Sequence, residues 1–262
     1  MKNNIISVFS KPWRECSAAQ LAEHVLKLGF DSVEFPLRDG YQVEPKNAVR
    51  DFPKFVAEMK GYGVSISSVA SDITEPIFEA CGAAGVKLIR LQAEVDLSIG
   101  YMKSEAKWVK QYNDILPWCE KYDVKVGIQQ HSGTCAATAM DMRHLLEKID
   151  NPYVGIVWDA GHCGAMFEPY EKSLDIIWDY LVRVNFKSMY VKQVSENPSI
   201  FRSIVTTSRQ GVVDWEQALN YLFKRGYEGP ICVPPEYSDL ENVDTHIVED
   251  LAYLKSLIAN LK

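Results

Sequence analysis

A repeated unit constrains the fold of this chain more than any other feature. Stretches with helical spacing end on a glycine or a polar turn and lead directly into a short, apolar, β-branched run. Glycine suits the left-handed backbone position that ends a helix, and a short apolar run suits a buried parallel strand. Runs of this kind span residues 32–35, 64–69, 86–91, 124–128 and 230–233. Because parallel strands need crossover connections, the repetition predicts an α/β fold.

Between these runs the apolar spacing changes to that of amphipathic helices. One apolar stripe predicts a helix over residues 17–28 with Ser17 as its N-cap. Similar stripes predict helices over residues 53–62, 73–83, 105–121, 137–149, 170–182, 215–225 and 245–261. Further apolar runs at 5–9, 154–157 and 186–191 bring the predicted strands to eight. Eight strand–helix units favour a single (β/α)8 TIM barrel over an open doubly wound sheet, which stays the alternative.

The composition excludes several classes of protein. No linker or charge block divides the 262 residues, so we expect one domain over residues 1–262. The formal net charge of -7 disfavours a nucleic-acid partner. Six scattered cysteines, the absence of a signal-peptide pattern and the lack of a bilayer-length apolar stretch predict a cytoplasmic protein without a membrane partner.

Polar side chains gather at the carboxyl ends of the predicted strands, where TIM barrels place their active sites. In the clearest case, the run 154–157 leads through Trp158 to Asp159 and His162. Asp159 also suits a cap of the next turn, and His162 an ordinary loop imidazole. The strand-end candidates are Glu34, Ser68, Ser71, Gln92, Glu94, Gln129, Gln130, His131, Asp159, His162, Tyr190, Lys192, Gln193 and Glu236. We expect these groups to converge on one mouth of the barrel.

Several short motifs, in this order, resemble the xylose isomerase-like barrel superfamily, in particular its sugar phosphate isomerase/epimerase group, which includes tagatose 3-epimerase-like enzymes. The motifs are Val33-Glu34-Phe35, Gly127-Ile128-Gln129-Gln130-His131, Trp158-Asp159-Ala160-Gly161-His162, Tyr190-Val191-Lys192-Gln193, Gly211-Val212-Val213-Asp214-Trp215, and Gly226-Tyr227-Glu228-Gly229 leading to Glu236. The resemblance spans essentially the whole chain. It implies a small-molecule sugar or sugar phosphate as substrate, and it allows a homo-oligomer, since such barrels often form dimers or tetramers.

The resemblance also implies a divalent metal, commonly Mn²⁺, Mg²⁺, Co²⁺ or Zn²⁺, held by Glu, Asp, His and Glu on strands five to eight. Asp159 matches the sixth-strand ligand, and Glu236 the eighth, although Pro234 also fits that register. Gln129 stands where the family has Glu, and Tyr190 where it has His. The expected ligands are therefore Asp159, Glu236 and Gln129. A neutral tyrosine is a poor ligand for these ions, so the departures argue against a complete set.

The same departures bear on catalysis. Epimerases of this group use two glutamates to move a proton at the carbon next to a carbonyl. An amide cannot take a proton, so Gln129 is excluded from this role and Glu236 is predicted to be one proton carrier. Candidates for the other are Lys192, His162, His131 and Glu94. Lys192 would lose solvation in a barrel mouth, which lowers a lysine pKa, unless the strand ends earlier and leaves it solvated.

Other residues are predicted to contact the substrate. They are Glu34, His131, Glu94, Tyr190, Arg202, Arg209 and Trp158. The two arginines lie in the long stretch 195–209, on the side of the barrel that often binds anions, but they also fit solvated surface charges. Glu34 fits a structural acceptor as well as a substrate contact, and Trp158 fits packing as well as stacking on a sugar.

Three functions agree with these observations. The leading hypothesis is a sugar or sugar-phosphate isomerase or epimerase, acting by proton transfer next to a carbonyl. The second, suggested by Gln129 and Tyr190, is a carbohydrate-binding barrel without turnover. The third is a lyase or dehydratase on the same scaffold, including a lysine-assisted step at Lys192. A related apurinic endonuclease is disfavoured, because its metal cluster needs many ligands and the chain has only five histidines.

Overall fold

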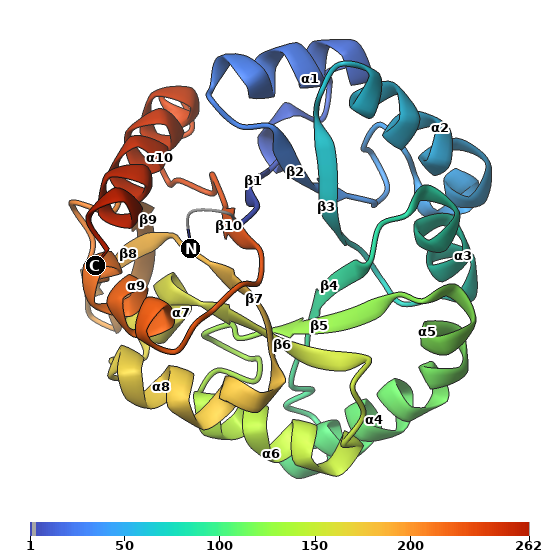
Figure 1. The fold of residues 1–262 in the computed structure, drawn as a ribbon. Coiled ribbons are helices and arrows are strands. Elements are labelled where there is room, and N and C mark those ends of the chain that lie inside the picture. The colour runs from blue at the N-terminus through green and yellow to red at the C-terminus, as the bar shows by residue number, and fades with distance from the viewer. Residues whose placement is uncertain (2–3, 262) are drawn as a thin grey trace.

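Eight parallel strands close into a barrel in the computed structural model, which describes residues 1 and 4–261 (Figure 1). The barrel strands are β1 (Ile6–Phe9), β2 (Ser32–Pro36), β3 (Ser65–Ala70), β4 (Leu88–Gln92), β5 (Lys125–Gln129), β6 (Val154–Asp159), β7 (Leu181–Asn185) and β10 (Ile231–Val233). Consecutive strands pair in parallel, and β10 closes the ring by pairing with both β7 and β1. The predicted (β/α)8 TIM barrel is confirmed.

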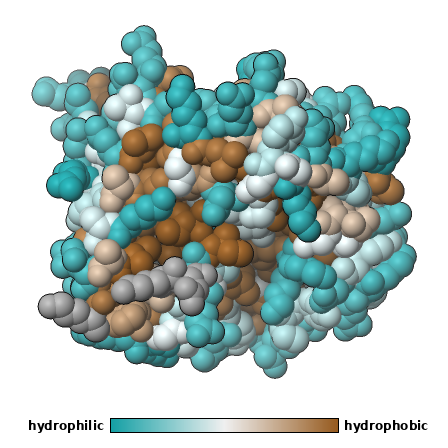
Figure 2. Space-filling model, turned by 45° about the horizontal axis from the view of Figure 1, so that its top comes forward, coloured by the Kyte–Doolittle hydropathy of each residue, from teal (hydrophilic) through white to brown (hydrophobic). Residues whose placement is uncertain are grey.

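Helices surround the ring of strands on its outer side (Figure 1). They are α1 (Ala18–Lys27), α2 (Ala48–Gly61), α3 (Glu75–Ala84), α4 (Tyr101–Asp114), α5 (Leu116–Tyr122), α6 (Ala139–Ile149), α7 (Ala160–Ala165), α8 (Tyr170–Ile177), α9 (Trp215–Lys224) and α10 (Val243–Asn260), with short 3-10 turns at Lys11–Trp13, Pro45–Asn47 and Trp178–Tyr180. On the face shown in Figure 2, hydrophilic side chains surround a smaller, hollowed hydrophobic area. In the described part of the chain, no helix is long and apolar enough to cross a membrane.

Local sequence signals explain where several helices begin. Ser17 caps α1 as predicted: its side chain accepts the N–H of Gln20, whose side chain accepts the N–H of Ser17 in return. The single helix predicted over residues 105–121 is two helices, α4 and α5. Pro117 lies in the first turn of α5, where a missing N–H costs nothing, whereas it would break a continuous helix.

The position predicted for the seventh barrel strand was wrong. That strand is β7, at residues 181–185, and the run 186–191 instead leads into β8 (Ser188–Glu196). β8 pairs antiparallel with β9 (Ser199–Thr206), and this hairpin forms a separate two-stranded sheet outside the ring (Figure 1). Most of the stretch expected to be a loop, residues 195–209, is therefore strand. The hairpin also carries Tyr190 and Lys192 away from the end of the barrel strand.

A charged residue inside β7 explains the error. Arg183 interrupts the apolar run from Leu181 to Val184, so the segment has the spacing of the end of an amphipathic helix. In the structure Arg183 is fully buried inside the barrel, where it pairs with Glu34. A buried arginine needs a partner that is distant in sequence, and local periodicity carries no information about it.

Gly155 in β6 provides a test of the packing against the start of β7. A Cβ atom at this position would lie 2.3 Å from Val182 Cγ1 and 2.7 Å from the carbonyl oxygen of Tyr180. We expect Gly155→Ala to lower the free energy of unfolding by about 1–3 kcal/mol, because the backbone cannot yield as a flexible side chain would. Urea denaturation measures this effect. Gly61→Ala, with no atom within 4 Å of its added methyl, is the control and should not destabilise; equal stability of both variants would contradict this packing.

Candidate active site

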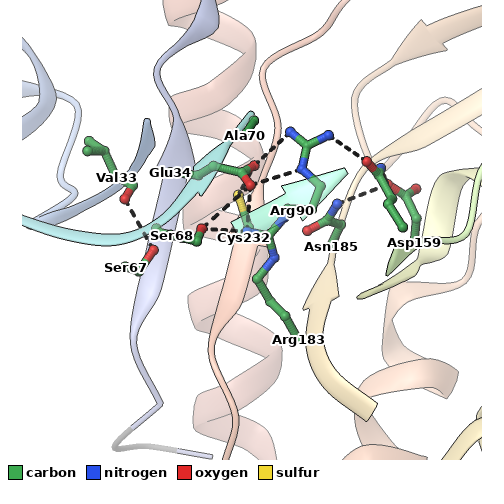
Figure 3. A network of polar contacts seen from close by, with 12 residues as sticks. Val33, Glu34, Ser67, Ser68, Ala70, Arg90, Asp159, Arg183, Asn185 and Cys232 are labelled. Atoms are coloured by element: carbon green, nitrogen blue, oxygen red, sulfur yellow. Dashed lines mark hydrogen bonds and ion pairs between the residues drawn. The ribbon is translucent and has the colours of Figure 1, made fainter. Parts of the chain in front are cut away.

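A buried ion-pair network crosses the barrel interior between β2, β4 and β7 (Figure 3). Glu34 on β2 is 0% exposed. It accepts hydrogen bonds from Arg90 Nε at 2.9 Å, from Arg90 Nη2 at 3.1 Å and from Arg183 Nη1 at 2.6 Å. Burial raises the pKa of Glu34, but the positive charges of Arg183 and Arg90 outweigh this and lower it to about 2. Glu34 is therefore a fixed anion that orients Arg90.

Arg90 continues the network toward the carboxyl ends of β5 and β6. Its Nη1 donates to Gln129 Oε1 at 2.7 Å, and Gln129 Nε2 donates to Asp159 Oδ2 at 2.6 Å. An arginine only donates, so it fixes the amide of Gln129 with the oxygen toward Arg90 and the NH2 group toward Asp159. From β7, Asn185 Nδ2 donates to the same Asp159 oxygen at 3.1 Å. Two amides thus donate into one carboxylate.

Asp159 has a second role at the start of α7. Its Oδ1 accepts the backbone N–H of His162 at 3.1 Å, which caps this short helix. Burial raises the pKa of Asp159, yet the Lys187 charge and the hydrogen bonds from Asn185 and His162 bring it below its ordinary value. The carboxylate therefore stays ionised in the folded protein. The alternative prediction that Asp159 caps the next turn is confirmed, and Asp159 still lies at the carboxyl end of β6.

Two histidines contact each other beside this carboxylate, with their ring planes tilted by 41°. The ring centroids of His131 and His162 are 3.8 Å apart, and Ser132 Oγ lies 2.9 Å from His162 Nδ1. Burial and the charge of Lys187 lower the pKa of His162 to about 3, so this imidazole is neutral. Its Nε2 is buried and has no hydrogen-bond partner among the described residues. His131 Nδ1 lies 2.8 Å from the carbonyl oxygen of Ser132, so Nδ1 carries the proton and Nε2 is free to accept one.

Lys187 lies between the carboxylates of Asp159 and Glu236. It follows β7 by two residues, and its side chain is only 4% exposed. Its Nζ lies 3.6 Å from Asp159 Oδ2 and 3.3 Å from Glu236 Oε2. Burial would lower the pKa of Lys187, but Asp159 and Glu236 raise it above its ordinary value. The group is therefore an ammonium ion held between two carboxylates.

Glu236 contacts Lys187 and also lines the cavity at the mouth of the barrel. It follows β10, and its Oε1 lies 2.7 Å from Nζ of Lys11, a residue just after β1. Burial raises the pKa of Glu236, but Lys187 and Lys11 outweigh it and hold this pKa well below its ordinary value. The cavity has a volume of about 840 Å³ and its lining includes Lys11, Arg38, Arg90, Glu94, His131 and Glu236. Charges of both signs thus face a space large enough for a small polyhydroxylated ligand.

This geometry agrees with the comparisons with known proteins. Residues 22–257 match the family described as "Xylose isomerase-like TIM barrel". The chain belongs to this family. A stretch of 138 residues is 26% identical to an inosose dehydratase from Lactiplantibacillus plantarum, covering 50% of this chain and 45% of that protein. The chain thus spans less than half the length of this curated relative.

Two solved structures share the complete barrel. The probable 3-DHS dehydratase AsbF, involved in petrobactin synthesis, from Bacillus anthracis has a TM-score of 0.75 at 12% identity, covering 96% of this chain and 98% of that one. D-psicose 3-epimerase from Clostridium cellulolyticum, solved with D-tagatose, has a TM-score of 0.74 at 13% identity, covering 97% and 99%. At these identities the likeness to both shows the fold alone.

Ten of the sequence-predicted residues come together in this xylose isomerase-like barrel. They are Glu34, Ser68, Ser71, Gln92, Glu94, Gln129, His131, Asp159, His162 and Glu236. Five of them line the cavity, namely Ser71, Gln92, Glu94, His131 and Glu236, whereas Glu34 and Ser68 lie in the ion-pair network. Their convergence follows from the barrel, which brings the carboxyl ends of all its strands to one mouth. Their roles in binding or catalysis stay predictions.

The other predicted residues lie elsewhere. The placement of Tyr190 and Lys192 at the end of strand seven was wrong, because both are on the hairpin, where exposed Lys192 lies opposite Arg202. The guanidinium carbon of Arg209 lies 4.7 Å from the ring centre of Tyr253 on α10. Trp158 is fully buried, and its Nε1 donates to Ser173 Oγ, so it packs in the core. None of these residues is in the described lining of the cavity.

Six residues of the site were missed from the sequence. They are Lys11, Arg38, Arg90, Arg183, Asn185 and Lys187. Had the seventh strand been placed at residues 181–185, Asn185 and Lys187 would have been its strand-end candidates, as Lys11 and Arg38 are for β1 and β2. No comparable signal marks Arg90 and Arg183, which lie within strands rather than after them.

The donor set does not fit the divalent metal that the family implies. Asp159 Oδ2 already accepts from both amides, which turn their NH2 groups toward it, and the Lys187 ammonium lies between Asp159 and Glu236. A divalent cation needs oxygen or imidazole donors in these positions, and an N–H group or an ammonium repels it. Within the described residues, no group of three or more His, Cys, Asp and Glu side chains is arranged to hold a metal.

Proposed function

We propose that this barrel is an isomerase or epimerase that moves a proton at the carbon next to the carbonyl of a sugar or sugar phosphate. The observation that carries the proposal is the position of Glu236, an ionised carboxylate on the cavity wall between two lysine ammonium groups. A carboxylate can take a proton from carbon, and a neighbouring cation can stabilise the oxygen that becomes negative.

Glu236 and Lys11 line the cavity, and buried Lys187 contacts Glu236 without being part of the described lining. Glu236 takes the proton, and the electrons of the C–H bond form a carbon–carbon double bond while the carbonyl oxygen becomes an enediolate oxygen. Lys11 and Lys187 supply positive charge beside this oxygen. Lys11 is 45% exposed, so its ammonium group can turn from Glu236 toward the substrate oxygen. Glu236 would then lose a stabilising positive charge, and its pKa would rise toward the working range.

The return of the proton decides the product. Delivery by protonated Glu236 to the former carbonyl carbon gives isomerisation, provided that the hydroxyl proton of the adjacent carbon passes to the enediolate oxygen so that the new carbonyl forms there. Delivery to the same carbon from the other face gives epimerisation and needs a second carrier, a role for which His131 is suited because it lines the same cavity. Burial and the Lys187 charge lower the pKa of His131, so this imidazole is neutral in the free protein and must take up a proton from solvent before it can deliver one to the enediolate, while Glu236 later returns its proton to solvent. The free guanidinium end of Arg38, whose Nε donates to the Ala70 carbonyl, suits a phosphate at the cavity edge.

A dehydratase is the second candidate. A stretch of 138 residues is 26% identical to an inosose dehydratase, and dehydration begins with the same proton abstraction next to a carbonyl. It ends differently, because a hydroxide leaves from the adjacent carbon with a proton supplied by the enzyme. Formation of an unsaturated ketone, measured by its ultraviolet absorbance, separates this reaction from isomerisation.

Hydrogen exchange tests the proposed function directly. Metal-depleted protein is incubated in D2O with a panel of ketoses and ketose phosphates in the presence of a chelator. We expect deuterium to enter the carbon next to the carbonyl of at least one substrate, observed by NMR, together with the isomer or epimer. If sugars bind by calorimetry without exchange or product across the panel, with and without added Mn²⁺, the barrel is a carbohydrate-binding protein instead.

A further inference from the structure

The site of Lys187 is shaped for the lysine side chain. A Cβ atom on Gly161 would lie 2.7 Å from Lys187 Cγ and 3.3 Å from its Cε, so this glycine leaves the space that the lysine stem occupies. Trp215 Nε1 donates to the backbone carbonyl of Lys187 at 3.3 Å and fixes the start of the chain segment. The stem therefore packs against Gly161 while Trp215 holds its backbone, and the position of Nζ is defined by packing as well as by charge.

The ammonium occupies the space between the two carboxylates that would have to share a metal. Its Nζ lies 3.3 Å from Glu236 and 3.6 Å from Asp159. A divalent ion bound to both carboxylates would have oxygen distances of about 2.0–2.2 Å and would lie within a few ångströms of Nζ. Its two positive charges would repel the ammonium in an environment with little water. The lysine and the ion thus compete for one position.

The neighbouring amides favour the ammonium. Gln129 and Asn185 both donate to Asp159 Oδ2, and Gln129 is held in that orientation by Arg90. These donors stabilise a carboxylate that carries one negative charge and faces one positive charge. The NH2 groups that face Asp159 supply neither the additional negative charge nor the lone pairs that a divalent ion requires.

We propose that the Lys187 ammonium replaces the divalent cation in this barrel and serves as its resident positive charge. The chain therefore binds no divalent metal at Asp159 and Glu236. Its use as the cation that stabilises an enediolate rests on the proposed function, whereas the competition with a metal rests on the geometry alone. Because its Nζ lies between two carboxylates, Lys187 acts as a charge and a hydrogen-bond donor.

Metal binding tests this inference without reference to turnover. The wild-type protein is dialysed against chelator and titrated with Mn²⁺, with free Mn²⁺ measured by electron paramagnetic resonance and bound metal by elemental analysis. We expect no saturable Mn²⁺ binding and no change in the thermal midpoint with either Mn²⁺ or chelator. About one equivalent of tightly held metal in the purified protein, with a lower midpoint after its removal, would overturn the inference.

A double variant, Q129E/K187M, is designed to replace the Lys187 ammonium with a divalent metal ion. It removes the ammonium while keeping an apolar stem, and it adds a third carboxylate beside Asp159 and Glu236. We expect saturable Mn²⁺ binding at least about tenfold tighter than any binding by the wild type, because affinity rises with ligand charge. K192M, the same substitution on the exposed hairpin, is the matched control and should not gain binding. Near-ultraviolet circular dichroism establishes that the double variant is folded, and a folded variant without this gain would contradict the inference.

The two proposals fail in different ways. A wild-type protein that binds no Mn²⁺ and exchanges no carbon-bound hydrogen supports the role of Lys187 in excluding metal and overturns the proposed function. A protein that exchanges hydrogen only after it takes up Mn²⁺ supports the reaction and overturns the inference about Lys187.

Discussion

Replacing Glu34 with glutamine should lower the free energy of unfolding by about 3–5 kcal/mol, because the change leaves two buried arginines without their counter-charge. Glu34 is 0% exposed, and Arg183 is 0% exposed as well. The Nε and Nη2 atoms of Arg183 already have no hydrogen-bond partner among the described residues, so no other group is in place to compensate. Glutamine keeps the volume of the side chain, and the loss therefore measures charge rather than a cavity.

Urea denaturation at neutral pH measures this loss. Glu79→Gln, an exposed substitution of the same type on α3, is the matched control and should change stability by less than about 0.5 kcal/mol. A Glu34→Gln variant within 1 kcal/mol of the wild type, by this order-of-magnitude scale, would show that the network is not what holds β2 to β7.

The stability difference between the wild type and the Glu34→Gln variant should depend on pH with a defined sign. The folded-state pKa of Glu34, about 2, lies below the unfolded value. Its contribution to stability is therefore complete above the unfolded pKa of about 4.3 and is lost as the pH falls from there toward 2. We expect the difference in unfolding free energy between wild type and Glu34→Gln to be constant near neutral pH and to shrink across this window. A difference that grows on acidification would contradict the assignment.

The fold could be predicted from the sequence because its signals are local. Glycines at helix ends, amphipathic stripes and short β-branched runs each report on a few adjacent residues, and eight repeats of the unit are compatible with few architectures. The seventh strand is the exception, because Arg183 made a barrel-interior segment resemble a helix end. The partner of Arg183 is Glu34, which lies 149 positions away in the sequence.

The candidate site could be predicted only in part, for a related reason. Carboxylates after apolar runs identify Asp159 and Glu236, since the barrel must bring strand ends together. Which lysine joins them depends on where β7 ends, and an error of a few residues exchanges Lys187 for Lys192. Arg90 lies within β4 rather than at its end, and only the arrangement of neighbouring strands shows that it reaches both Glu34 and Gln129.

Replacing Glu236 with glutamine should lower the rate of carbon-bound hydrogen exchange by about 10²–10⁴-fold, the usual contribution of a positioned proton carrier. Glutamine fills the same space and keeps one oxygen that can accept from Lys11 or Lys187, so the shape of the cavity and substrate binding should change little. The loss is thus expected in kcat, measured by deuterium incorporation into the substrate identified from the panel, with KM nearly unchanged. Glu241→Gln, an exposed substitution later in the same loop, is the matched control.

The pH profile distinguishes a proton carrier from a residue that only positions Lys187. In the free protein the pKa of Glu236 lies well below its ordinary value, so the carboxylate is in the accepting form throughout the neutral range. The profile of kcat/KM, which reports the free enzyme, should stay level as the pH falls through the ordinary glutamate pKa of about 4.3 and decline only below it. Removing a positive neighbour with Lys11→Met should move this acid limb to higher pH, because the ammonium no longer stabilises the ionised form. An acid limb that does not move would mean that another group takes the proton. The same conclusion would follow if the rate of the Glu236→Gln variant were within tenfold of the wild-type rate, because the loss expected for a proton carrier is at least ~10²-fold.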